Sequence, residues 1–215
     1  MDNLQTNQKV KYDFNSLGKK VFSSPSVWIA YLIVILLFII GHLVSPGFSS
    51  FSNIMNVLNI SALLGFIALA QTLVVMSGDE GIDLSVGATA SLSAVMSTQI
   101  INGLDQNIVI AVLAILVTGF LIGCINGVGV AYFKVPPLVM TLAMASVIQG
   151  LALVYTNGQP KGMASPGLKA LGTGETIGIP NLILLWIVIV IFAAIFLNQT
   201  KWGMILYGLG TNRLT

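Results

Sequence analysis

Charged residues are scarce in this sequence of 215 residues. They make up 7% of it, against about 25% in a typical soluble domain, while 56% of its residues are hydrophobic. A soluble fold of this size could not hide so much apolar surface from water, so lipid must form part of the environment. The net charge of +2 gives no indication of nucleic-acid binding. The composition therefore predicts an integral membrane protein that has the lipid bilayer, and no nucleic acid, as a partner.

Cysteine and histidine are nearly absent, with one residue of each. A single cysteine excludes an intramolecular disulfide and a cysteine-rich metal site, and Cys124 is expected to pack as a small apolar residue. The nucleotide-binding pattern G-x-x-x-x-G-K-[ST] is missing, as are H-E-x-x-H and G-x-S-x-G. We expect no metal, no cofactor and no catalytic residue on this chain, so any work that it does against a gradient must draw its energy from a partner or an ion.

Long apolar segments dominate what is present. Six are apparent, roughly Val27–Val44, Ile54–Met76, Leu84–Ile101, Ile108–Tyr132, Leu138–Val154 and Leu182–Leu197. An 18-residue helix covers ~27 Å, close to the ~30 Å hydrocarbon core, and backbone groups in lipid must bond within their own segment. The expected fold is an all-α bundle with about six transmembrane spans. The third segment, rich in Ser, Thr, Ala and Gly, also fits a partly re-entrant segment.

The chain divides into a polar start and an apolar remainder. Residues 1–20 are polar, carry mixed charge and predict a flexible cytoplasmic tail, and residues 21–215 predict a transmembrane domain. The first apolar run is about 18 residues long. The hydrophobic part of a signal peptide is usually ~7–15 residues, so a retained anchor is expected.

Lysine and arginine set the expected orientation. With six spans and the N-terminus inside, seven basic residues fall on the cytoplasmic side, namely Lys9, Lys11, Lys19, Lys20, Lys134, Lys201 and Arg213. Only Lys161 and Lys169 fall outside. This bias predicts that both termini are cytoplasmic and that the longest connection, Tyr155–Pro180, is extracytoplasmic.

Small residues recur at a spacing of four, which places them on one helix face. Gly119, Gly123 and Gly127 form one such ridge, and the expected role is close packing between helices. A second stripe consists of the hydroxyl residues Ser85, Thr89, Ser93 and Ser97, which either pack or line a polar path.

An acidic cluster lies in residues 78–87, between two apolar segments. Asp83 fits a helix cap, because a side-chain oxygen can bond the free amides of a first helical turn. The same cluster also fits a turn in a transport path or a subunit contact, and the two interpretations are compatible. Pro136 and Pro137 are expected to start the fifth helix, since proline suits a first turn.

Four amide side chains lie within or near the apolar segments, namely Asn59, Gln71, Asn126 and Gln149. An amide facing lipid would lack partners, so each is expected to face the bundle. Bonding between helices is favoured over contact with a solute.

Residues 81–87 read G-I-D-L-S-V-G, which resembles the signature of the ribose and simple-sugar permeases of bacterial ABC importers. Further matches follow in the family's order: Gly123-x-x-Asn126-Gly127, then Lys134-x-Pro136 with Thr141-Leu142, then Gly203-x-x-x-Tyr207-x-x-Gly210-x-Asn212. The resemblance runs from about Phe51 to the last residue. Departures from the pattern are Asp79-Glu80 between two glycines that are often adjacent, Pro137 at a common aromatic position and Gly208 at a common alanine position.

The resemblance implies a membrane-embedded subunit of a sugar importer in the bacterial cell membrane. Its expected partners are a cytoplasmic ABC ATPase subunit, a second permease subunit in a homo- or heterodimer, and an extracytoplasmic solute-binding protein. Members of the family are longer, so the domain is expected to be incomplete at its C-terminus.

Other classes stay open beside this one. They are a branched-chain amino acid permease, a secondary carrier, and a partner or scaffold that does not itself transport. A carrier should show inverted repeats and a carboxylate at mid-membrane, whereas the acids here cluster at a helix end. An enzyme needs converging nucleophile and base groups, which one histidine and one cysteine hardly supply.

Two sets of candidate residues result. Those for a substrate path or motif are Asn59, Gln71, Asp83, Ser85, Thr89, Asn126 and Gln149; those for helix packing are Gly87, Gly119, Gly123 and Gly127.

Overall fold

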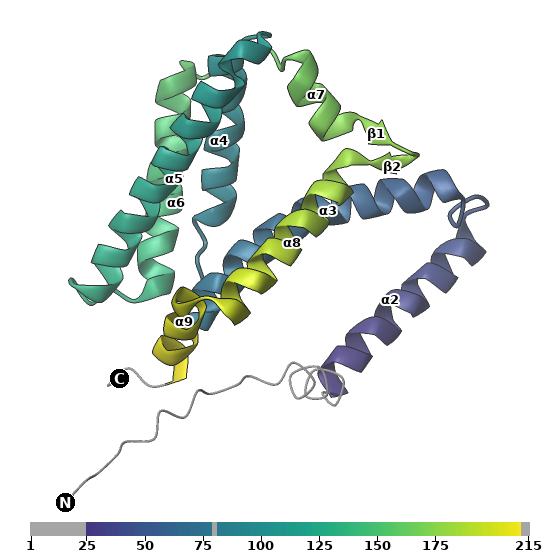
Figure 1. Cartoon of the computed structure of the whole chain (residues 1–215), viewed down its shortest axis with the longest axis horizontal. Helices are drawn as coiled ribbons and strands as arrows, with labels where there is room; N and C mark the ends of the chain where they lie inside the picture. The colour runs from purple at the N-terminus through teal and green to yellow at the C-terminus, as the bar shows by residue number, and fades with distance from the viewer. Residues whose placement is uncertain (1–24, 79–80, 212–215) are drawn as a thin grey trace, which may run out of the picture. The chain divides into compact units, whose positions relative to one another are not determined.

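The computed structural model of the chain describes residues 25–78 and 81–211, most of which are helical (Figure 1). The chain forms two compact units, one up to Asn56 and one from Val57 onward. The tail expected at residues 1–20 lies outside the described residues.

The first unit contains α2 (Pro25–Val44) and the start of α3 (Phe51–Met76). The rings of Phe38 and Phe48 meet edge to face with centroids 5.5 Å apart. The side chain of Asn53 donates to the carbonyl of Phe48 over 2.6 Å. These contacts fix the turn between the two helices. No residue of α2 is buried, as expected for a helix surrounded by lipid.

Three helices form the centre of the second unit: α4 (Val86–Ile101), α5 (Ile108–Ala131) and α6 (Pro137–Thr156). They lie side by side (Figure 1). Their core is a small apolar cluster made of Leu92, Met144 and Ile148, with Met96, Ile122 and Met140 packed around it. At 16 residues α4 rises only ~24 Å, so it is too short to cross the hydrocarbon core as a straight helix.

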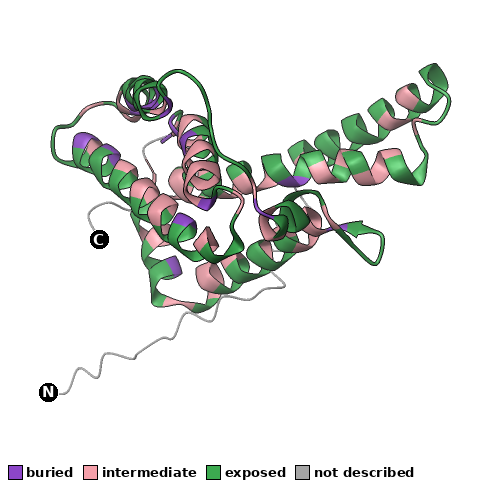
Figure 2. Cartoon of the chain, turned by 90° about the horizontal axis from the view of Figure 1, so that it is seen from above, coloured by how far each residue is buried: buried purple, intermediate pink, exposed green. Residues whose placement is uncertain are grey.

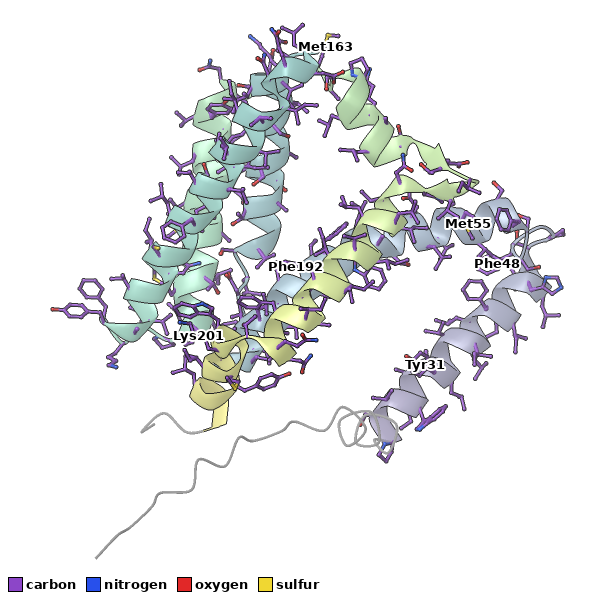
Figure 3. The ribbon with its side chains drawn as sticks, in the orientation of Figure 1. Tyr31, Phe48, Met55, Met163, Phe192 and Lys201 are labelled. Carbon is purple, nitrogen blue, oxygen red and sulfur yellow. The ribbon has the colours of Figure 1, made fainter. Side chains whose placement is uncertain are left out.

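The remaining elements are η1 (Asp105–Asn107), α7 (Pro166–Thr173), β1 (Glu175–Thr176), β2 (Ile179–Pro180), α8 (Asn181–Gln199) and α9 (Lys201–Thr211). The two short strands pair antiparallel. They are joined by Ile177 and Gly178, both at positive φ, as a two-residue hairpin turn requires. The amide of Gly103 donates to the carbonyl of Met163 over 2.8 Å, which ties the connection after α6 to the end of α4 (Figure 3).

Glycines allow the closest approaches around α3. Gly65 lies against the indole of Trp186 from α8, where a Cβ would clash with the ring. At the C-terminal end of α3, Gly210 of α9 lies against the carbonyl of Met76, and a Cβ on Gly78 would be 3.3 Å from the Gly210 Cα. The middle of α3 and its C-terminal end are therefore in contact with helices that follow much later in the sequence.

The structure confirms the all-α fold, and each of the six expected apolar segments contains a helix. Five helices of the described residues are long and apolar enough to cross a membrane, and α4 is the shorter sixth. The prediction that proline starts the fifth helix is also confirmed, since α6 begins at Pro137. Most residues are exposed or half-buried (Figure 2), and Phe192 on α8, labelled in Figure 3, is 70% exposed. The orientation of the termini stays a prediction.

Candidate functional site

The residues Ile82–Ser85, called the polar turn below, form the last part of the connection from α3 to α4 and have no helical structure of their own. Two side chains that bond the polar turn, Gln71 on α3 and Asn126 on α5, each lie five residues before the end of their helix. At 1.5 Å per residue, the polar turn therefore lies roughly 7 Å inside these helix ends. Within a membrane, irregular backbone is tolerated only where protein covers it or where it lines a cavity.

Gln71 on α3 holds the middle of the polar turn. In the orientation that satisfies both groups, its amide nitrogen donates to the backbone carbonyl of Asp83 over 3.2 Å, and its oxygen accepts from the backbone amide of Asp83 over 3.0 Å. This pairing replaces the hydrogen bonds that a helix would have supplied to that peptide group. Gln71 therefore bonds within the bundle, as predicted.

Thr141 on α6 holds Ile82 and Leu84, the two residues on either side of Asp83. Its hydroxyl accepts from the amide of Leu84 over 3.1 Å and donates to the carbonyl of Ile82 over 3.2 Å. The side chain is buried at 4% exposure. Sequence reasoning did not select Thr141 as a site residue; its place in the T-L part of the family pattern was the available signal.

Asp83, Ser85 and Asn126 form a chain of hydrogen bonds at the end of the polar turn. The backbone amide and the hydroxyl of Ser85 both donate to Oδ1 of Asp83, over 2.8 and 2.6 Å. The Nδ2 of Asn126 on α5 donates to the hydroxyl of Ser85 over 3.0 Å. Bonds to a carboxylate are the stronger kind, so this chain fixes the start of α4.

The expected capping role of Asp83 needs a correction. The N-cap of α4 is Ser85, and its side chain makes no cap bond. Asp83 binds the amide of Ser85 itself and not an amide of the first turn, because the helix begins at Val86, later than the sequence suggested. Asp83 thus shapes the approach to the helix.

The amide oxygen of Asn126 is an exception to the good pairing around it. Asn126 is 7% exposed, and its Oδ1 is buried without a hydrogen-bond partner among the described residues. Leaving a buried polar atom unpaired costs about 1–3 kcal/mol, so each such atom in a native structure calls for an explanation.

Two hollows lie beside the polar turn. The first has a volume of about 380 Å³ and is bounded by the end of α3, the polar turn, α5 at Gly123, Asn126 and Gly127, and the start of α6. The second has a volume of about 400 Å³ and lies between α3, α4 and α5. Val74, Asp83 and Gly123 border both, so the two hollows adjoin each other at these residues.

The hydroxyl stripe of α4 faces the second hollow. Ser85, Thr89 and Ser93 all line it. The hydroxyl of Thr89 also donates to the carbonyl of Ser85 over 2.9 Å. The sequence left two roles open for this stripe, which were packing and lining a polar path. Three of its members line a hollow.

The prediction that the glycine ridge packs against a helix is wrong for the described residues. A Cβ built on Gly119, Gly123 or Gly127 would meet nothing within 4 Å, and the same holds for Gly87. The glycine of α5 that packs closely against another helix is Gly129, where a Cβ would lie 2.5 Å from the sulfur of Met140 on α6. The ridge faces the hollows because α5 turns its other side to α6.

Two predicted amides lie apart from the polar turn. Gln149 is exposed on α6, so the expectation that it faces the bundle is wrong within this chain. Asn59 is half-buried about 18 Å along α3 from Gln71, and its Oδ1 has no partner among the described residues. Neither residue joins the site, and any role for them in a substrate path stays a prediction.

Known proteins resemble this chain over most of its length. It is 31% identical over 205 residues to a ribose import permease protein of Escherichia coli strain K12, an alignment that covers 91% of this chain and 62% of the relative. It is 34% identical to the ribose import permease protein of Bacillus subtilis, over 98% of this chain and 63% of the relative. A fructose import permease protein of Bifidobacterium longum is 29% identical, over 96% of this chain and 61% of the relative.

These matches leave part of each relative uncovered. The chain spans about six tenths of the length of the curated relatives it matches. No solved structure gave a significant match.

The family model that matches residues 53–215, about three quarters of the chain, is described as a branched-chain amino acid transport system permease component. The match covers the polar turn, the glycine ridge and all helices of the second unit. With its long apolar helices, the chain is a multi-pass protein of the bacterial inner membrane, and it belongs to this family of transport permease components.

Proposed function

We propose that this chain forms the membrane-spanning permease subunit, or the larger part of it, of an ATP-driven importer for a neutral sugar. The observation that carries the proposal is the polar turn between apolar helices, held by three of them beside two adjoining hollows. The names of the relatives supply the class of solute.

A path for a polar solute through lipid needs polar groups at depth, space beside them and a backbone that stays in place. Broken helices meet these needs in many transporters, because the helix end presents polar groups at the solute site. Here α4 starts inside the ends of α3 and α5, and Gln71, Thr141 and Asn126 hold the residues before it. The glycine ridge supplies the space.

The driving force must reach this chain from elsewhere, since its sequence has no nucleotide-binding loop. The proposed assembly therefore contains a cytoplasmic ABC ATPase subunit, a second permease subunit that completes the path, and an extracytoplasmic binding protein that delivers the solute.

Branched-chain amino acids are the second candidate, because the matching family model is described by them. Among the described residues that line the two hollows, Asp83 is the only ionisable side chain. Asp83 could pair with the ammonium group of an amino acid, but no described cation in the lining could pair with its carboxylate, whereas a neutral sugar needs no charged partner and its hydroxyls donate to such an acceptor. The lining therefore favours a neutral sugar.

Growth tests separate the two candidates. We expect that deleting the gene for this chain slows growth of its host on ribose as sole carbon source, and that a plasmid copy restores it. A leucine-requiring host should grow equally well on limiting leucine with and without the gene. Unchanged growth on ribose together with impaired use of leucine would contradict the sugar assignment.

A further inference from the structure

The second hollow has walls of unlike chemistry. Its wall on α3 is apolar and partly aromatic, and consists of Phe66, Ile67, Ala70 and Val74. Its polar side consists of Asp83 from the polar turn together with Ser85, Thr89 and Ser93. Pockets for small ligands measure about 300–1,000 Å³ and combine apolar or aromatic walls with a few polar groups. At about 400 Å³ the second hollow has the size and the mixed lining of such a pocket.

Ser93 is the exception among the hydroxyl residues of α4. The other four, Thr89, Ser91, Ser97 and Thr98, each donate to a backbone carbonyl three or four residues earlier. Such bonds satisfy a hydroxyl within its own helix. Ser93 is half-buried and has no hydrogen-bond partner among the described residues, so its hydroxyl can still donate and accept.

Asp83 offers a second group of this kind. Its Oδ1 accepts both bonds from Ser85, whereas its Oδ2 has no hydrogen-bond partner among the described residues. Within that same part of the chain, the side-chain atoms that are both fully buried and unpaired belong to other residues. Oδ2 of Asp83 and Oγ of Ser93 therefore keep accessible surface, and both residues line the second hollow.

The first hollow has fewer free groups. It shares Asp83 with the second, but the hydroxyl of Thr141 is used in both directions and that of Ser77 donates to the carbonyl of Val74. The Nδ2 of Asn126 is bonded to Ser85, and its Oδ1 is fully buried. None of the described residues around the first hollow is aromatic. The second hollow is therefore the better candidate for a binding site.

The free groups of the second hollow favour a ligand rich in hydroxyls. Oδ2 of Asp83 can only accept, and the hydroxyl of Thr89, whose hydrogen is bonded to the carbonyl of Ser85, can accept as well. Ser93 lies one helical turn beyond Thr89, about 6 Å along the axis, so one small molecule can reach both. On the α3 side, the negative face of the Phe66 ring attracts C–H groups. A monosaccharide carries both kinds of partner.

We propose that the second hollow is a monosaccharide site, in which Oδ2 of Asp83 and the hydroxyl of Ser93 bind sugar hydroxyls and the ring of Phe66 packs against sugar C–H groups. The inference rests on the proposed function, which supplies a neutral sugar as the solute. It adds which of the two hollows holds the sugar and which side chains contact it.

Cysteine accessibility tests the site without relying on transport. Ala90 and Ser93 both line the second hollow. Ala90→Cys and Ser93→Cys are made singly in a Cys124→Ser background, and the complete transporter is reconstituted in nanodiscs, where both membrane faces are open. A charged, water-soluble methanethiosulfonate should modify both cysteines, because the reactive thiolate forms where water reaches the sulfur.

Added D-ribose should slow this modification by about twofold at a concentration equal to its Kd, and by more above it. L-leucine should have no effect. Absence of reaction at both positions, or a rate that D-ribose leaves unchanged at every concentration, would overturn the site. Protection by L-leucine alone would also overturn it.

Ser91 provides the matched control. It lies on α4 between the two reporter positions, is exposed and lines neither of the two hollows. All three cysteine variants are also labelled with a lipid-soluble maleimide, which reaches positions that face lipid. D-ribose should slow the labelling of Ala90→Cys and Ser93→Cys and leave that of Ser91→Cys unchanged. Equal protection of all three would indicate a change of the whole helix and would contradict a sugar in the hollow.

Two substitutions test the contacts, with Ala90→Cys as the reporter. Ser93→Ala and Phe66→Leu should each raise the D-ribose concentration for half-maximal protection roughly threefold to tenfold. Ser91→Ala should leave it unchanged. The Ser93 hydroxyl bonds no described residue, so Ser93→Ala should melt at the temperature of the reporter parent, which separates lost binding from lost stability. An unchanged half-maximal concentration in both variants would refute the contacts.

The outcomes distinguish this inference from the proposed function. If the wild-type transporter imports ribose while ribose protects neither reporter cysteine, the inference fails and the proposed function stands. If ribose protects the reporters but is not imported, the site stands and the proposed function fails. If ribose is neither imported nor protective, both fail.

Discussion

Removing the hydroxyl of Thr141 should destabilise the protein measurably. Valine has nearly the shape of threonine but cannot accept from Leu84 or donate to Ile82, so Thr141→Val loses both bonds to the polar turn. Hydrogen bonds between helices in membrane proteins contribute about 0.6 kcal/mol on average and up to about 1.7. Two bonds to a buried turn give an expected loss of about 1–3 kcal/mol.

The assay is thermal unfolding of the purified protein in detergent. For a chain of this size, 1 kcal/mol corresponds to about 2–4 °C in melting temperature, so a loss near 2 kcal/mol lowers it by about 4–8 °C. Thr141→Ser keeps the hydroxyl, so its melting temperature should fall by less than that of Thr141→Val.

A second control makes the same substitution where the hydroxyl has no interhelical role. Thr72 on α3 is exposed and donates only to the carbonyl of Ala68 in its own helix. The free energy of unfolding of Thr72→Val should stay within about 0.5 kcal/mol of the wild-type value. If Thr141→Val melts at the wild-type temperature, or no lower than Thr72→Val, the polar turn is not held by α6 as described.

Two further predictions concern glycines. Gly129→Leu should lower the yield of folded protein in size-exclusion chromatography, because its Cβ would lie 2.5 Å from the Met140 sulfur. Gly87→Leu, with nothing within 4 Å of its Cβ, should elute like wild type. Equal yields for the two variants would count against this packing. Gly210→Val would press a side chain onto the Met76 carbonyl, so α9 should detach and be cleaved faster by trypsin than in wild type. An unchanged cleavage rate would mean that α9 does not depend on this contact.

Helices and buried polar residues were open to prediction from the sequence for a physical reason. Lipid offers backbone groups no partners, so each long apolar run had to be a helix. The same cost drew Gln71, Ser85 and Asn126 together, since an amide or hydroxyl at depth must find partners within the protein. The structure brings these three side chains to one turn.

What lies opposite a given helix face could not be predicted in the same way. A spacing of four shows that Gly119, Gly123 and Gly127 share a face, but the same pattern fits a packed helix and an open hollow. Thr141 raises a related difficulty. A threonine in an apolar segment usually bonds its own helix, as Thr72 does, whereas the hydroxyl of Thr141 bonds the polar turn because that turn lies beside it.

The central claim is most directly tested by transport in proteoliposomes that contain this chain, its ATPase subunit and a second permease subunit, with the binding protein added outside. Radiolabelled D-ribose and L-leucine are supplied separately, each with ATP or with a non-hydrolysable analogue. The account predicts accumulation of ribose that requires ATP and no accumulation of leucine. Accumulation of leucine alone, or uptake of ribose that is equal with the analogue, would contradict it.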